Sequence, residues 1–407
     1  MQPVVLDVYS SAGVGVVALL LGLFLTRTVP FLKRFCIPAP VSGGLIISLF
    51  TLLLYVIFGL ECSFDGTVRD LCMMLFFTSV GFQCDLRVLR KGGRPLVVMI
   101  GLVAVLIVMQ NLISVGIARG LGLDPLFGMA TGSIPMSGGH GTSGGFSPLL
   151  EEMGLSGANS ITMAAATFGL VAGSLLGGPL GETLIRRRRL AQQSEPSDVM
   201  RGIEASEASP AGAARDEEQT FRAYLKAACE LIIAMALGTG VSRLLALTGI
   251  TFPTYFGALL AASLIRNLSS LSPRLSAQIT TRELTSIGDI CLQLFLGMAM
   301  ASLRLWELAS LALPMLLILA SQVVFMALYG AFVAFPLLGR DYDGAVLVSG
   351  LCGFGLGATP NAMANMSAVC YKYRYAVAPF IIVPIIGAMF VDLINTGVVT
   401  LFLNIIH

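Results

Sequence analysis

The chain has 407 residues, of which 56% are hydrophobic and only 12% are charged, and its mean hydropathy is +0.86. Soluble domains carry about twice as much charge, so this composition excludes a soluble globular protein and indicates a polytopic membrane protein. The net charge of +2 gives no support for nucleic-acid binding. The eight cysteines form no CxxC or Cys/His cluster, which indicates neither a disulfide framework nor a resident metal site.

Ten apolar runs are long enough to be helical spans, and a polar tract divides them into two sets of five. The runs are 12–28, 42–58, 68–84, 95–117 and 161–184, followed by 231–247, 253–265, 287–303, 313–337 and 378–403. The tract, residues 186–222, has too few apolar residues to form a core. We interpret it as a cytoplasmic linker between an N-terminal half, residues 1–185, and a C-terminal half, residues 223–407.

Two glycine-rich segments, residues 131–146 and 349–365, lie among these runs. Glycines and Pro135 interrupt any helix over the first segment, and a break that faced lipid would leave peptide groups unpaired at several kcal/mol each. We therefore expect each segment to face protein or water and to line a polar cavity. The breaks predict two re-entrant hairpins, near residues 125–150 and 343–368.

The two halves repeat each other in the spacing of particular residues. Thr142 follows Asp124 by 18 residues, as Thr359 follows Asp341. Further pairs in register are Gly138 with Gly355 and Gln110 with Gln322. Internal symmetry of this kind is typical of transporters built from inverted repeats.

Basic residues between the runs set the orientation. If each broken segment returns to its own side, most basic loops share one side, which is then cytoplasmic. The second half is then inverted, and both termini lie outside. The expected fold is therefore an all-α polytopic membrane protein with two inverted-topology repeats of about five transmembrane helices, each with a re-entrant broken-helix hairpin. The alternative, in which the broken segments cross fully, would divide the basic loops between the two sides.

The hairpins carry the candidates for substrate binding. Helix N-termini attract carboxylates and unwound carbonyls coordinate cations, so two breaks at mid-depth would combine both. The candidates are Ser133, Ser137, Gly138, Gly139 and Thr142 in the first hairpin, with Thr359, Asn361 and Asn365 in the second. The alternative is that small residues only let helices approach closely, and a matched pair of breaks disfavours it.

Asp392 lies inside the last apolar run, and an acid at membrane depth is by default a functional candidate. Asn395 and Thr396 follow it on the same helical face, and the three predict a Na⁺ site. The alternative is a structural pairing of Asp392 with an arginine. Three mid-span amides are further ion-binding candidates, although they could instead cross-link helices: Gln110, Asn111 and Gln322.

Two more residues of the broken segments attract attention. His140 could carry a proton, but a lone histidine in a loop more often serves as a hydrogen-bonding group, and we favour that interpretation. We expect Cys352, in the second hairpin, to lie on the permeation path. The chain has no GxSxG, HExxH or phosphate-loop motif, so we expect neither an enzyme nor a cofactor.

Four motifs distributed over both halves carry a family resemblance. They are Val108-Met-Gln-Asn111, Ser137-Gly-Gly-His-Gly-Thr142, Leu303-Arg-Leu-Trp-Glu-Leu-Ala-Ser-Leu-Ala-Leu-Pro314, and Gly353-Phe-Gly-Leu-Gly-Ala-Thr-Pro360 with Ala364-Asn-Met366. In combination they make the whole chain resemble the bacterial sodium/glutamate symporters. The resemblance implies uptake of L-glutamate across the bacterial inner membrane with Na⁺ as coupling ion, paired re-entrant loops, and a homodimer. The rival from another class is a channel for small solutes or ions, built on the same broken helices.

Overall fold

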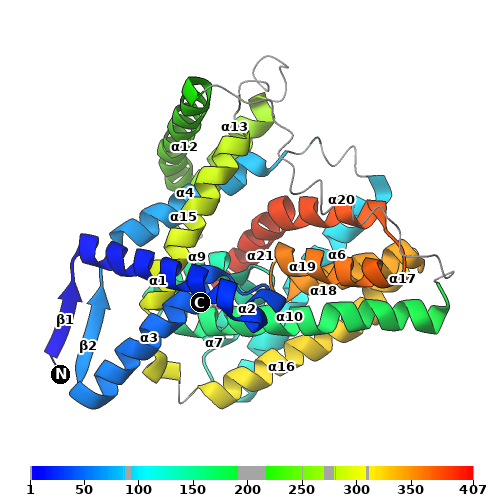
Figure 1. The fold of residues 1–407 in the computed structure, drawn as a ribbon, viewed down its shortest axis with the longest axis horizontal. Helices are drawn as coiled ribbons and strands as arrows, with labels where there is room; N and C mark the ends of the chain where they lie inside the picture. Colours follow the sequence, from blue (N-terminus) through cyan, green and yellow to red (C-terminus); the bar gives the residue numbers. More distant parts are fainter. Residues whose placement is uncertain are drawn as a thin grey trace.

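The computed structural model describes residues 2–85, 87, 93–190, 217–249, 251–269, 279, 281–308 and 311–406. Helices account for nearly all of these residues (Figure 1). The expectation of an all-α fold misses one feature, a parallel pair of short strands, β1 (Gln2–Leu6) and β2 (Leu60–Phe64). Each strand has only five residues, and its partner is distant in the chain, so no local pattern indicates the pairing.

Each of the ten expected runs coincides with a helix over most of its length. Seven helices there are long and apolar enough to cross a membrane: α1 (Val8–Thr28), α3 (Ala39–Phe58), α6 (Gly93–Gly120), α10 (Ala158–Arg188), α12 (Glu217–Ala246), α15 (Thr281–Ala301) and the continuous stretch Ala312–Leu337. That stretch comprises α16 (Ala312–Tyr329), the π-helical η2 (Gly330–Ala334) and α17 (Phe335–Leu337). The other three runs form α4 (Thr67–Gln83), α13 (Phe256–Ser269), and α20 (Val377–Ile385) with π-helical η3 (Ile386–Phe390) and α21 (Val391–Ile406). Short connecting helices are α2 (Pro30–Arg34) and η1 (Leu305–Leu308).

Both described ends of the expected linker are helical. The chain continues α10 to Arg188, and α12 begins at Glu217, well before the apolar run that starts at residue 231. A search for apolar runs misses this first part of α12 because its residues are polar. Ion pairs between side chains one turn apart on the helix surface contribute to its stability instead. Arg222 pairs with Glu218 at 2.6 Å, which is an i, i+4 pair. Residues 191–216, which make up most of the expected linker, lie outside the described residues.

Six helices pack together into what we call the scaffold group: α1, α3, α4, α12, α13 and α15. α1 lies against α3 and α15, α12 lies against α13, and α4 contacts both α13 and α15 (Figure 1). Just after the end of α4, the Asp85 carboxylate accepts from Arg87 at 2.9 Å and from Arg266, in the last turn of α13, at 3.2 Å. The hydrogen bond from Arg87 is the main reason why the pKa of Asp85 is lowered.

The remaining helices form a second body, which we call the hairpin group: α6, α10, α16, α17, α20, α21 and the broken segments described below. α10 crosses this group as one long helix, with α16 beside it (Figure 1). The two groups meet where α15 contacts the first broken segment and where α4 contacts η3. Any ligand site between the broken segments therefore lies close to the boundary between the groups.

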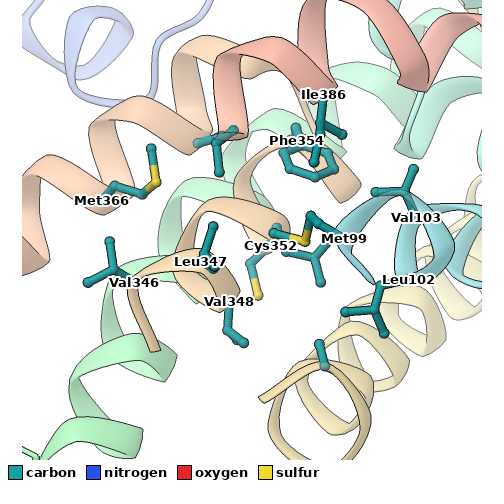
Figure 2. Packing of buried hydrophobic residues seen from close by; sticks show 14 of the residues in the cluster. Met99, Leu102, Val103, Val346, Leu347, Val348, Cys352, Phe354, Met366 and Ile386 are labelled. Carbon is teal, nitrogen blue, oxygen red and sulfur yellow. The ribbon is translucent and has the colours of Figure 1, made fainter. Parts of the chain in front are cut away.

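The core of the hairpin group contains Cys352, contrary to its expected place on the permeation path. Figure 2 shows Cys352 packed among Met99, Leu102 and Val348, and its side chain is 0% exposed. The helix that carries Cys352 is buried on almost every side, so its sequence contains no polar face from which the direction of one side chain could be predicted.

Candidate functional site

The first glycine-rich segment forms three helices with two breaks: α7 (Pro125–Ala130), α8 (Ser133–Met136) and α9 (Gly139–Glu152). Asp124 caps α7, because its carboxylate accepts from Leu126 N at 2.7 Å. The second break requires Gly139, whose φ of +61° lies in the left-handed region that favours glycine. The break leaves the first N–H groups of α9 without intrahelical acceptors.

The second segment has one break, between α18 (Tyr342–Gly355) and α19 (Thr359–Lys372). Asp341 caps α18 in the same way, since its carboxylate accepts from Gly344 N at 2.7 Å. The two aspartates that occupy matching positions in the predicted repeat thus both cap a helix. Pro360 stands in the first turn of α19, where its missing N–H costs no hydrogen bond.

The tips of the two broken segments meet. Ser137 Oγ lies 3.4 Å from Gly355 O, and a Cβ added to Gly139 would lie 2.9 Å from Gly357 O. Gln110 joins the two tips from α6, because its Nε2 donates to Gly355 O at 2.7 Å and its Oε1 accepts from Ser137 Oγ at 2.7 Å. The breaks that the sequence places more than 200 residues apart therefore form one polar junction.

A cavity of about 290 Å³ opens at this junction. Five of the predicted site residues line it, namely Ser137, Gly138, Gly139, Thr359 and Asp392. The scaffold group contributes Phe76 and Leu292 to the wall, so the cavity lies between the two groups. Among the described residues that line it there is no arginine or lysine.

A larger cavity of about 440 Å³ lies elsewhere, between β2, the start of α10 and η1. Arg69, Arg304, Glu151 and Glu307 line it, so its charges balance. None of the predicted site residues and none of the helix breaks line it. We therefore take the smaller cavity, at the junction of the breaks, as the candidate site.

Asp392 and Asn395, two of the predicted ion-binding residues of the last span, lie beside the first broken segment. Thr142 Oγ1 donates to the Asp392 carboxylate at 3.2 Å. Ser133 Oγ donates to Asn395 Oδ1 at 2.7 Å, and a Cβ on Gly138 would lie 2.5 Å from the Asn395 amide. The carboxylate, hydroxyl and carbonyl oxygens of this cluster are hard ligands of the kind that alkali and alkaline-earth cations prefer. No group of three or more His, Cys, Asp or Glu side chains that could hold a metal occurs in the described ranges.

Comparison with known proteins identifies the family. A family model described as "Sodium/glutamate symporter" matches residues 4–375. The sodium/glutamate symporters of Escherichia coli (strain K12) and Shigella flexneri are each 40% identical to the chain over 402 residues, covering 98% of both sequences. The sodium/glutamate symporter of Haemophilus influenzae is 36% identical over 400 residues, again with 98% coverage of both. The chain belongs to the sodium/glutamate symporter family.

Membership of this family confirms the resemblance carried by the four motifs. It also confirms that the chain is not an enzyme, because the family consists of transporters. Together with the seven apolar helices of the described residues, it establishes a multi-pass membrane protein.

Several candidates lie close to the junction of this symporter-family protein without lining the cavity. Asn361 and Asn365 turn toward α10, donating to Leu170 O at 2.7 Å and to Gly173 O at 2.9 Å. Gln322 Nε2 donates to Gln110 O at 2.8 Å, so the two matched glutamines cross-link helices. The remaining two candidates also have protein partners: Asn111 Oδ1 accepts from Ser133 N at 2.9 Å, and Thr396 Oγ1 lies 3.4 Å from Tyr255 OH.

The structure adds residues that the sequence reasoning missed. Gln293 lines the cavity from α15, and its position in an apolar run is the same signal that singled out Gln110. Tyr255 stacks on Phe77 with a centroid separation of 3.7 Å and contacts the last span through its hydroxyl group. No local pattern marks Tyr255, because it follows Pro253 in a short loop and becomes buried only through contacts with distant helices.

Proposed function

We propose that this protein carries L-glutamate into the cell together with Na⁺ by alternating access. The observation that carries the proposal is the cavity where two broken segments meet at the boundary between two helix groups. The relatives at 36–40% identity are named sodium/glutamate symporters, and they match the chain over nearly its whole length. Movement of the hairpin group against the scaffold group would expose the cavity alternately to each side.

The substrate would bind to backbone and hydroxyl groups. Both α9 and α19 begin at the cavity, and helix N-termini present free N–H groups and partial positive charge to anions. Ser137, Gly138, Gly139 and Thr359 stand at these helix starts. Since no lysine or arginine lines the cavity in the described residues, the two carboxylates of glutamate need an additional source of positive charge.

Bound Na⁺ would supply that charge. Asp392 faces the same cavity and would repel an anionic substrate until a cation neutralises it. Na⁺ held by Asp392 and the neighbouring Thr142, Asn395 and Ser133 would raise glutamate affinity, and by linkage glutamate would raise Na⁺ affinity. This reciprocity is the physical basis of coupling.

The proposal includes two inverted repeats, re-entrant hairpins, and both termini outside the bacterial inner membrane. Polar contacts between helix ends support it, because each joins ends assigned to the same face. Contacts at the cytoplasmic face are Arg266 with Asp85 at 3.2 Å and Lys372 with Glu182 at 2.7 Å; those at the outer face are Arg304 with Glu61 at 3.4 Å and Thr251 with Asn404 at 2.9 Å. The proposed homodimer rests on the family resemblance alone and is testable by cross-linking in membranes.

Transport into proteoliposomes tests the function. With an inward Na⁺ gradient, radiolabelled L-glutamate should accumulate above its external concentration, and uptake should saturate with substrate. Removing the gradient should abolish accumulation. Uptake that is equally fast without the gradient and does not saturate would instead identify the channel.

A cysteine introduced at Ser197 tests the topology. Ser197 lies in the expected linker, outside the described residues. In a variant without other reactive cysteines, an impermeant maleimide should label it only in inside-out vesicles. Labelling in intact cells would contradict the inverted threading.

A further inference from the structure

His140 is the second residue of α9, and it lines the cavity although only 6% of it is exposed. Its Nε2 lies 3.0 Å from Thr167 Oγ1 on α10. Its second ring nitrogen, Nδ1, has no hydrogen-bond partner within the described residues. Nδ1 does not belong to the fully buried atoms without a partner in the described residues, and a polar atom that is accessible in a residue lining a cavity is a candidate for contact with a ligand.

Thr167 determines which nitrogen carries the proton. A hydroxyl group has one hydrogen, and Thr167 Oγ1 donates it to Met163 O at 2.9 Å. With its hydrogen directed at Met163 O, the hydroxyl accepts from His140, and on this ground we assign the ring hydrogen to Nε2. No carboxylate contacts the ring in the described structure, and a buried cation without a charged partner is costly, so the ring is neutral. Nδ1 is then a lone-pair acceptor.

A hydrogen-bond acceptor such as His140 Nδ1 can bind only a donor group of the substrate. The carboxylates of an amino acid only accept hydrogen bonds and are served by the N–H groups of the helix starts, whereas the α-ammonium group only donates. We propose that His140 Nδ1 accepts a hydrogen bond from the α-ammonium group and so selects amino acids over plain dicarboxylates. The positive end of α9 disfavours a cation there, and the Asp392 carboxylate in the same cavity offsets this effect. The inference rests on the proposed transport of glutamate.

Two substitutions of His140 distinguish the contribution of Nδ1 from that of Nε2. His140→Gln places an amide N–H near Nε2, which keeps the contact with Thr167, but provides no acceptor at the position of Nδ1. His140→Asn places its amide at the position of Nδ1 and can keep the acceptor while losing Thr167. Both variants are compared with the unmodified protein in proteoliposomes, with the KM for L-glutamate and the inhibition constant of glutarate, which lacks the amino group, as readouts.

His140→Gln should raise the KM for glutamate by about tenfold to a hundredfold, the value of one hydrogen bond to a charged group. The inhibition constant of glutarate should change by less than about threefold, since it loses no contact. His140→Asn should raise the KM for glutamate less than His140→Gln does. Equal weakening of both ligands, or a larger effect of His140→Asn, would overturn the proposal and assign His140 a packing role.

Two alternative measurements test the proposal if glutarate does not inhibit or if the His140 variants do not fold. If glutarate does not inhibit the unmodified protein, the order of the Asn and Gln variants decides. If neither variant folds, Thr167→Val frees the ring to take the other tautomer, and the KM for glutamate should rise without a matching change for glutarate. Absence of Na⁺-driven glutamate uptake by the unmodified protein would be a failure of the proposed function, not of this inference.

Discussion

Replacing Gln110 by methionine tests how the junction of the two broken segments is held together. Gln110 Nε2 donates to Gly355 O at 2.7 Å, and Gln110 Oε1 accepts from Ser137 Oγ at 2.7 Å. Gln110, Ser137 and Gly355 are all buried. Methionine has a similar volume but neither a donor nor a comparable acceptor, so the substitution removes both contacts without leaving a large void.

The expected change in the free energy of unfolding follows from the number of polar groups that Gln110→Met leaves without partners. Each hydrogen bond contributes about 1 kcal/mol net, and a buried polar group left unpaired costs about 1–3 kcal/mol more. Gly355 O lies 3.4 Å from Ser137 Oγ, so the serine hydroxyl can turn to it, and one hydrogen bond then satisfies both stranded groups in part. We expect Gln110→Met to lower the free energy of unfolding by about 2–4 kcal/mol.

Gln322→Met is the matched control, because the two glutamines occupy matching positions in the predicted repeat. Gln322 makes one hydrogen bond, to Gln110 O at 2.8 Å, and that carbonyl also accepts from Ser114 Oγ at 2.8 Å. In the described structure Gln322 Oε1 is buried without a partner, so its removal relieves an unpaired acceptor. The free energy of unfolding should therefore change by less than about 1 kcal/mol.

Titration of mixed micelles with SDS, followed by circular dichroism, measures both free energies. Ser137→Ala in the Gln110→Met background should still lower stability, because the serine hydroxyl there bonds Gly355 O in place of Gln110 Oε1. An equal or larger loss for Gln322→Met, or a loss under about 1 kcal/mol for Gln110→Met, would refute the reasoning.

Three further predictions address the ion, the packing and the pH dependence. Asp392→Asn should abolish uptake at ordinary Na⁺ and allow partial recovery at high Na⁺, without a change in which amino acids are carried; altered selectivity at unchanged Na⁺ dependence would contradict this. Gly387→Ala should reduce uptake at least about tenfold, because its Cβ would overlap the Thr359 hydroxyl, whereas Gly397→Ala in the same span meets nothing within 4 Å and should transport normally. Asp85 has a lowered pKa, so its contribution to stability is present above about pH 4 and is lost as the pH falls through the lowered value. The melting midpoint of Asp85→Asn should accordingly vary less below that pH than that of the unmodified protein.

The sequence by itself determined the helices and the places where they break. Apolar runs of spanning length and clusters of glycine are local signals, because the cost of an unpaired peptide group in lipid is the same whatever the fold. The spacing of Asp124 and Asp341 likewise revealed two equivalent helix starts, and both prove to be N-caps. Capping acts within one turn of helix, so its signal is local as well.

Only the tertiary structure decided which polar side chains reach the cavity. Asn361 and Asn365 turn toward α10, Cys352 enters an apolar core, and His140 lines the cavity. Helices that are surrounded by other helices have no side that faces lipid or water. Hydrophobic periodicity therefore cannot predict in which direction each of their side chains points. Direction is set there by the packing of segments more than 200 residues apart, such as Gln110 between the two breaks, and that packing leaves no trace in any local stretch of the chain.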